Sequence, residues 1–168
     1  MRTLLALVTA VFLAFAAPCP AAQASDVVGF SDSVRPGTIV VRTAERRLYL
    51  ALGNGQALRF SVGVGKPGKQ WEGSTRIIGK YLKPAWIPPP EVKRDNPALP
   101  DFIAGGAPGN PMGAAALLLT GGEYAIHGTN RPDSIGGFVS YGCIRMRNAD
   151  ILELFQYVRV STSVVVAP

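Results

Sequence analysis

The alternation of apolar and polar residues predicts short strands in the first half of the chain. Residues 38–42 and 46–52 are rich in β-branched and aromatic side chains, and a short polar turn separates them. The tripeptide at 53–55, Gly-Asn-Gly, is typical of a tight hairpin because Asn and Gly tolerate positive φ. Residues 56–64 are therefore expected to return antiparallel to the preceding strand.

The pattern of apolar residues in the second half of the chain predicts further strands and one helix. Apolar residues three and four positions apart predict a helix over 148–158, with Asn148 as its N-cap. The expected apolar stripe of this helix is Ile151, Leu152, Phe155 and Val158. Strands are expected over 75–82, 115–120, 123–127 and 163–166. The pattern predicts a mostly β fold in a single domain with a short C-terminal helix.

A long segment rich in proline and glycine, 84–111, separates two of the predicted strands. Its consecutive prolines at 88–90 are incompatible with the interior of a helix or of a central strand. A loop of this length in a compact domain is more often a lid or a binding segment than a plain connection. A disordered excursion is the alternative.

The N-terminal residues have the pattern of an export signal. Arg2 precedes an uncharged apolar run, and residues 22–24, Ala-Gln-Ala, have the small-x-small pattern of a cleavage site. We expect residues 1–24 to be a secretory signal peptide, residues 25–35 an N-terminal extension and residues 36–168 the functional domain. The apolar run is shorter than the roughly 20 residues that cross a bilayer, so no transmembrane span is expected after cleavage.

The charge of the chain is basic, with 17 Lys and Arg against 11 Asp and Glu and a formal net charge of +6. In an exported domain this charge suits the anionic polymers of a cell envelope. Nucleic acid is the other polyanion to consider, but export and the lack of basic runs with interleaved aromatics argue against it. A basic surface that serves only solubility explains the charge equally well.

Three residues near the end of the chain carry the candidate chemistry. Without residues 1–24, Cys143 is the only cysteine and has no partner for an internal disulfide. His127 is the only histidine, and Arg145 follows the thiol by two positions. Since a thiol needs a nearby base or cation to become nucleophilic, the three predict thiol catalysis. We expect Cys143 to react with iodoacetamide well below the pH of a free thiol.

Strand alternation predicts how these groups are arranged. Tyr124 and Ile126 are expected to face the core and His127 the opposite side, and in 141–147 the alternation places Cys143 and Arg145 outward. Arg145 would then hold a substrate carboxylate while the thiol attacks a nearby carbonyl. A solvated surface charge is the alternative for Arg145. The candidate oxyanion hole consists of the backbone N–H groups of Tyr141, Gly142 and Cys143.

The sequence argues against both a nucleotide-binding site and a zinc site. Residues 63–69 have the glycine and lysine spacing of a phosphate-binding loop, but Gln70 stands where a Ser or Thr would hold magnesium. We expect a turn at a strand end there. One histidine and one remaining cysteine are too few for the three or four ligands of a zinc site, so neither a metal nor another cofactor is expected.

The stretch 126–148 resembles the signature of the YkuD-type L,D-transpeptidases of bacterial peptidoglycan. It contains His-Gly-Thr-Asn at 127–130 and Ser-x-Gly-Cys-Ile-Arg-Met at 140–146, followed by Asn-x-Asp at 148–150. The resemblance extends over nearly all of 36–168. It implies a YkuD-like β-sandwich and a peptidoglycan stem peptide as substrate, broken between its third residue and the terminal D-alanine.

The resemblance also implies roles for individual residues. The matched Cys143 is the acyl-enzyme nucleophile, His127 is its base, and the carbonyl of Gly128 orients the imidazole ring. Arg145 and Ser140 match residues of the donor pocket, and Trp86 is a further candidate contact to the substrate. Carbapenems are expected to acylate the thiol.

One position departs from the family pattern, because Tyr141 stands where a second histidine usually precedes the Gly-Cys pair. Tyr141 can still donate its backbone N–H to an oxyanion. If the usual imidazole protonates the leaving amine, turnover should be slower here or its pH profile shifted.

The expected function is therefore that of an exported, cysteine-dependent L,D-transpeptidase of the periplasm or cell envelope. It would transfer the acyl group to an amine of a second stem peptide, of an outer-membrane protein or of a free D-amino acid. An L,D-carboxypeptidase that uses water as acceptor is one alternative. A non-catalytic module that binds the cell wall is the other.

Overall fold

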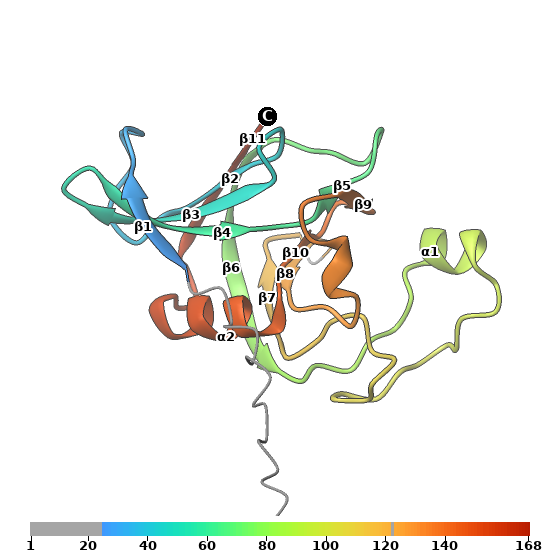
Figure 1. Ribbon diagram of the computed structural model, residues 1–168. Coiled ribbons are helices and arrows are strands. Elements are labelled where there is room, and N and C mark those ends of the chain that lie inside the picture. Colours follow the sequence, from blue (N-terminus) through green and yellow to red (C-terminus); the bar gives the residue numbers. More distant parts are fainter. Residues whose placement is uncertain (1–24, 122) are drawn as a thin grey trace, which may run out of the picture.

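The computed structural model describes residues 25–121 and 123–168, so the expected signal peptide lies outside the described residues. Figure 1 shows a β-rich body with one short helix packed against it and a second helix on a projecting arm. The helices are α1 (Pro90–Asp95) and α2 (Asn148–Tyr157), with a 3-10 turn at Pro132–Ser134. The strands are β1 (Asp26–Gly29), β2 (Ile39–Arg42), β3 (Arg47–Gly53), β4 (Gln56–Ser61), β5 (Val64–Gly65), β6 (Gly73–Leu82), β7 (Ala115–Leu119), β8 (Ala125–His127), β9 (Phe138–Ser140), β10 (Ile144–Arg145) and β11 (Ser163–Ala167).

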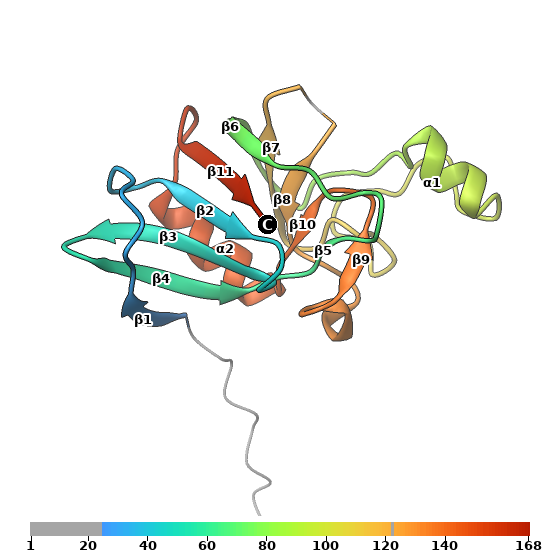
Figure 2. The ribbon, with the colours of Figure 1, turned by 90° about the horizontal axis from the view of Figure 1, so that it is seen from above.

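Strand β6 belongs to two sheets and joins them. Its first half pairs with β11 and its second half with β7, so β6 passes from one sheet into the other. The first sheet has the order β1-β4-β3-β2-β11-β6, and the second continues as β6-β7-β8-β10 (Figure 2). The two sheets form the mostly β sandwich that the sequence predicts, and α2 follows β10 as expected.

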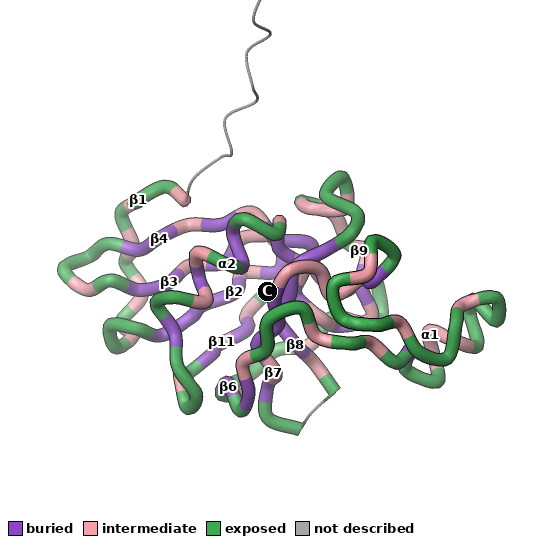
Figure 3. Tube along the Cα trace, turned by 90° about the horizontal axis from the view of Figure 1, so that it is seen from below, coloured by how far each residue is buried: buried purple, intermediate pink, exposed green. Residues whose placement is uncertain are grey.

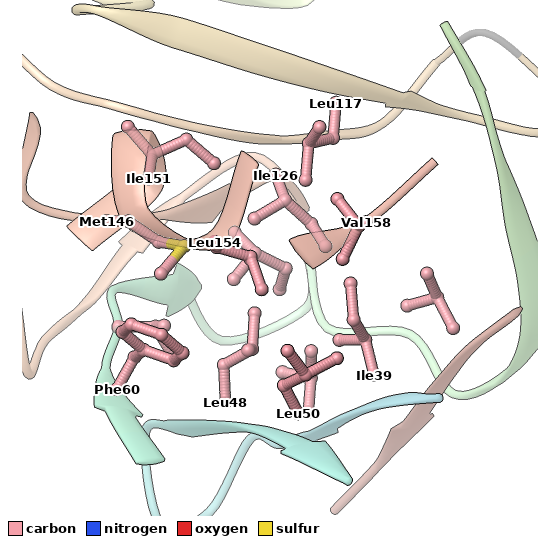
Figure 4. Packing of buried hydrophobic residues seen from close by; sticks show 14 of the residues in the cluster. Ile39, Leu48, Leu50, Phe60, Leu117, Ile126, Met146, Ile151, Leu154 and Val158 are labelled. Carbon is pink, nitrogen blue, oxygen red and sulfur yellow. The ribbon is translucent and has the colours of Figure 1, made fainter. Parts of the chain in front are cut away.

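The core lies between the first sheet on one side and the second sheet with α2 on the other. Leu48 and Phe60 of the first sheet point toward Ile126 of β8 and Leu154 of α2 (Figure 4). Burial follows the strands through the centre of the molecule, whereas most of the arm that carries α1 is exposed or half-buried (Figure 3). Each fully buried side chain of this size stabilises the fold by about 1.5–3 kcal/mol.

Helix α2 differs from the prediction in its cap and in its buried face. Arg147, rather than Asn148, occupies the N-cap position, and no side chain caps the helix. Leu154 is fully buried, whereas Leu152 is 40% exposed. The reason is geometric, because Ile151 and Leu154 are three residues apart and share a helix face that Leu152 does not.

The arm 84–111 contains a helix that the prolines were expected to exclude. Pro90 is the first residue of α1, where a missing N–H costs no intrahelical hydrogen bond. The base of the arm is fixed by the buried Asn110, whose Nδ2 donates to the carbonyls of Pro84 at 2.9 Å and Ala104 at 3.0 Å. The arm is therefore an ordered excursion from the sandwich.

Two turns have the predicted form. Gly53, Asn54 and Gly55 all have positive φ and join β3 to β4. Residues 63–69, which have the glycine and lysine spacing of a phosphate-binding loop, also form a turn. In this turn the N–H of Lys69 donates to the carbonyl of Lys66 at 2.8 Å. Strand β6 follows this turn, as expected for a strand connection and not for a phosphate-binding loop.

The N-terminal extension expected at 25–35 contributes a strand to the first sheet. Strand β1 pairs antiparallel with β4, with Asp26 opposite Arg59. The residues that the structure describes include no helix long and apolar enough to span a membrane.

Candidate active site

Strands β8 and β10 bring the three candidate catalytic residues together. The two strands are parallel neighbours, with Arg145 opposite His127 and Ile144 opposite Ile126. The isoleucines are buried in the core, so the paired His127 and Arg145 lie on the other face, as strand alternation predicts. Both residues line one cavity of about 510 Å³ together with Cys143.

The same cavity collects the other residues proposed from the sequence. Trp86, Ser140 and Tyr141 line it, and the arm forms one wall through residues 89–92. Met112, Glu123 and Tyr124 also line it. The arm therefore borders the candidate site, where a lid or a binding segment would lie.

The imidazole of His127 is held neutral. Its Nδ1 lies 2.6 Å from the carbonyl oxygen of Gly128, which can only accept, so Nδ1 carries the proton and Nε2 keeps its lone pair. The side chain is only 4% exposed. Burial, the largest cause, and the positive charge of Arg145 together lower its pKa to about 4, although hydrogen bonds to the backbone of Gly128 and Pro111 act in the opposite direction. His127 is thus a neutral base at physiological pH.

Asn148 fixes the backbone that orients this ring. Its Oδ1 accepts the N–H groups of Ala114 and Thr129, both at 3.0 Å, instead of capping α2. A side chain at Gly128 would overlap this oxygen, so only glycine fits there. Asn148 therefore positions the Gly128 carbonyl against Nδ1, a role that the N-cap prediction missed.

Cys143 is not the acidic thiol that its neighbours in the sequence predict. Burial raises its pKa, and the backbone of Ala125 and the charge of Arg145 only partly offset the increase. The side chain is nevertheless partly exposed and lines the cavity. In the resting protein the thiol is therefore neutral, and its nucleophilicity depends on proton transfer to a base.

Arg145 has the environment of an anion-binding group. Its guanidinium is partly buried, and burial lowers its pKa. Within the described residues it forms no salt bridge, and its Nε is buried without a hydrogen-bond partner. A carboxylate that enters the cavity therefore meets a guanidinium that no acidic side chain of the described residues neutralises.

The loop before Cys143 is held by two aromatic residues that the sequence analysis did not assign to the site. Trp71 stacks on Tyr124 with ring centroids 5.1 Å apart, and its Nε1 donates to the carbonyl of Gly142 at 2.9 Å. Gly142 has φ +119°, and a side chain there would overlap the Tyr124 ring. No short motif marks Trp71, because its partner Gly142 is far away in sequence.

The candidate oxyanion hole is smaller than the sequence predicts. The N–H of Gly142 already donates to Oγ of Ser140 at 3.1 Å, and that hydroxyl donates to the carbonyl of Cys143 at 2.6 Å. Ser140 is only 1% exposed, so it stabilises the loop from within. Among the residues the structure describes, the N–H groups of Tyr141 and Cys143 have no partner, and they remain the candidate donors.

Comparisons with known proteins agree with this geometry. Residues 36–166 match the family model of the YkuD L,D-transpeptidase catalytic domain. The probable L,D-transpeptidase ErfK/SrfK of Escherichia coli strain K12 is 42% identical over 140 residues, which are 79% of this chain and 44% of that protein. The probable L,D-transpeptidase YbiS of the same strain is 40% identical over 142 residues, 79% of this chain and 45% of that protein. The chain thus spans less than half the length of these curated relatives.

Solved structures share the fold at low sequence identity. An L,D-transpeptidase from Mycobacterium smegmatis superposes with a TM-score of 0.62 at 16% identity, covering 78% of this chain and 58% of that one. The catalytic domain of the Enterococcus faecium L,D-transpeptidase gives a TM-score of 0.61 at 18% identity, covering 81% and 100% respectively.

Proposed function

As this chain belongs to the YkuD L,D-transpeptidase catalytic-domain family, we propose that it breaks a peptidoglycan tetrapeptide stem between the third residue and D-alanine. The acyl group passes through Cys143 to an amine. The observation that carries the proposal is the pairing of His127 with Arg145 on adjacent strands, in the cavity that Cys143 also lines. We further propose that residues 1–24 direct export and that the catalytic domain, 36–168, acts in the cell envelope.

Acylation begins with proton transfer from the thiol of Cys143 to Nε2 of His127. The sulfur attacks the carbonyl of the third stem residue, and the N–H groups of Tyr141 and Cys143 hold the oxyanion that forms. Collapse of this intermediate breaks the bond to D-alanine, and the imidazolium returns the proton to the leaving amine. The product is a thioester on Cys143 and free D-alanine.

Deacylation repeats these steps with a new nucleophile. The acceptor amine attacks the thioester carbonyl and gives a proton to His127, which then returns it to the departing sulfur. A new amide and the free thiol result. The acceptor amine belongs to a second stem peptide or to an outer-membrane protein in this proposal.

Arg145 links substrate binding to the strength of the base. Its positive charge contributes to the low pKa of His127. A substrate carboxylate on the guanidinium would neutralise that charge locally, which raises the basicity of the imidazole when the donor is in place. The lack of a salt bridge to Arg145 within the described residues supports this use of the side chain.

We expect Arg145→Ala to lower kcat/KM about 10- to 150-fold, the loss of one charge-assisted contact of about 1.5–3 kcal/mol. Arg145→Lys should lose less, because it keeps the charge but not the bidentate fork. Steady-state kinetics on stem peptides measure both values. Thermal unfolding should barely move, since the guanidinium has no salt bridge in the described part of the chain. If Arg145→Ala lowers kcat/KM equally for donors with a free and with an amidated carboxylate, Arg145 has a structural role and does not bind the carboxylate.

Product analysis tests the proposed reaction directly. With a purified tetrapeptide stem and an amine acceptor, mass spectrometry should find D-alanine and the acyl group joined to the amine. Without the amine, the thioester should accumulate or hydrolyse slowly to the tripeptide. Equal yields of tripeptide with and without the amine would instead identify a carboxypeptidase, and an unchanged stem would contradict both activities.

A further inference from the structure

Tyr141 connects the catalytic loop to the arm. Its hydroxyl donates to Oδ2 of Asp95, the last residue of α1. Lys66 completes this contact, because its Nζ lies 3.7 Å from the centroid of the Tyr141 ring and 3.4 Å from the same carboxylate oxygen. The hydrogen bond from Tyr141 and the charge of Lys66 lower the pKa of Asp95, so this carboxylate remains ionised.

A second lysine of the same turn holds the other end of α1. Lys69 forms an ion pair with Glu91, in the first turn of the helix. The two acidic residues of α1 thus each contact one lysine of the turn 66–69. This turn belongs to residues 63–69, which have the glycine and lysine spacing of a phosphate-binding loop. Its two lysines bind the carboxylates of α1.

Apolar packing contributes little to holding α1, because none of its residues is buried. Figures 1 and 2 show it on the projecting arm, outside the two sheets. Glu91 and Val92 nevertheless line the cavity that contains Cys143. The position of one cavity wall therefore depends on exposed polar contacts, and such contacts are individually weak and screened by salt.

We propose that Lys66, Lys69 and Tyr141 form a latch that holds α1 closed over the active-site cavity. Tyr141 is then a positioning residue, since its side chain fixes the arm while its backbone N–H faces the reaction. This explains why a phenol suits a position where the family usually has histidine: the hydroxyl reaches a carboxylate of the arm. The effect on catalysis rests on the proposed function, but the latch itself does not.

The test compares three single variants of the full chain with the wild type. Tyr141→Phe removes only the hydroxyl and keeps the backbone N–H, and Asp95→Asn removes the charge that Lys66 and Tyr141 hold. Asp101→Asn is the matched control, because Asp101 is also an acid of the arm but pairs with Lys93 inside it. Hydrogen exchange of amides in 84–111 measures opening of the arm. Iodoacetamide labelling of Cys143, located by peptide mapping, measures access to the cavity.

We expect Tyr141→Phe and Asp95→Asn to accelerate both exchange and labelling about threefold to tenfold, the effect of one lost polar contact. Asp101→Asn should stay within about twofold of the wild type. One molar salt should accelerate exchange and labelling in the wild type, and it should have a smaller effect on Asp95→Asn. Tyr141 and Asp95 contribute to the same contact. The increase in exchange and labelling rates in the double variant should therefore be smaller than the product of the increases in the two single variants.

Unchanged hydrogen exchange in both Tyr141→Phe and Asp95→Asn would overturn the latch. An increase in exchange in Asp101→Asn as large as in these two variants would also overturn it. These outcomes are independent of turnover. If exchange responds as expected but the wild type does not process stem peptides, the proposed function fails and the latch stands. If stem peptides are processed and the arm does not respond, only the latch fails. In an active enzyme, the latch variants should raise KM more than they lower kcat.

Discussion

We expect Cys143→Ala to abolish acyl transfer and to leave the domain folded. The proposed mechanism has no other nucleophile, because the residues the structure describes contain a single free cysteine. The side chain is small and partly exposed, so alanine creates little cavity and little loss of stability is expected. Release of D-alanine from a stem peptide should fall to the background of a reaction without enzyme, measured by mass spectrometry.

A carbapenem gives a second measurement of the same residue. Its strained lactam carbonyl is an acyl donor, and its carboxylate can pair with the guanidinium of Arg145, which forms no salt bridge in the described part of the chain. The intact mass of the wild-type protein should rise by one carbapenem, whereas that of Cys143→Ala should not change. An adduct on the alanine variant, or its substantial residual turnover, would end the assignment of Cys143 as nucleophile. Thermal unfolding of both proteins controls for loss of fold.

Local patterns were sufficient to predict most strands of the two sheets and the shared face of the site, although β1, β5 and β9 were not predicted. The alternation around Ile126 and Ile144 depends only on backbone geometry, and both residues are buried as predicted. The hairpin at 53–55 likewise depends on residues that tolerate positive φ. The existence of helix α2 follows from its apolar spacing, although its cap does not.

The supports of the site could not be predicted, because they join segments distant in sequence. Trp71 supports Gly142, and Asp95 reaches Tyr141, through contacts that no spacing rule connects. The helix α1 is stabilised by such contacts and not by an apolar stripe. Asn148 was assigned from its place before a helix, while its actual partners come from two other loops.

The protonation state of the thiol is a further property that only the folded chain determines. A cysteine next to a base and an arginine suggests a lowered pKa. Burial acts in the opposite direction and is the largest cause, so the pKa of Cys143 is raised. The same burial makes His127 neutral. In the proposed mechanism the thiol therefore transfers its proton to His127 during the attack, and the two residues do not form an ion pair beforehand.

This state of the pair predicts an unusual pH profile for the wild type. His127 loses its function as a base when it is protonated, so kcat/KM should fall as pH drops through about 4, the pKa of the buried imidazole. A histidine of ordinary pKa would place this fall near 6.5. An acidic limb near 6.5 in the wild type, measured with a stem peptide of constant charge over this range, would contradict the neutral and buried base.

His127→Ala should lower acylation by about 10² to 10⁴ at neutral pH, the usual contribution of a positioned general base. Without the base only thiolate that is already ionised can attack, and the raised pKa of Cys143 makes that fraction small. The loss should therefore shrink as pH rises toward the pKa of the thiol, by about tenfold for each pH unit. His127→Gln is the control for packing, because it fills more of the buried site and cannot accept the proton. Single-turnover acylation by a carbapenem measures the rates of both variants. A loss that stays constant from pH 6 to 10, with unfolding temperatures unchanged, would assign His127 a role other than that of the base.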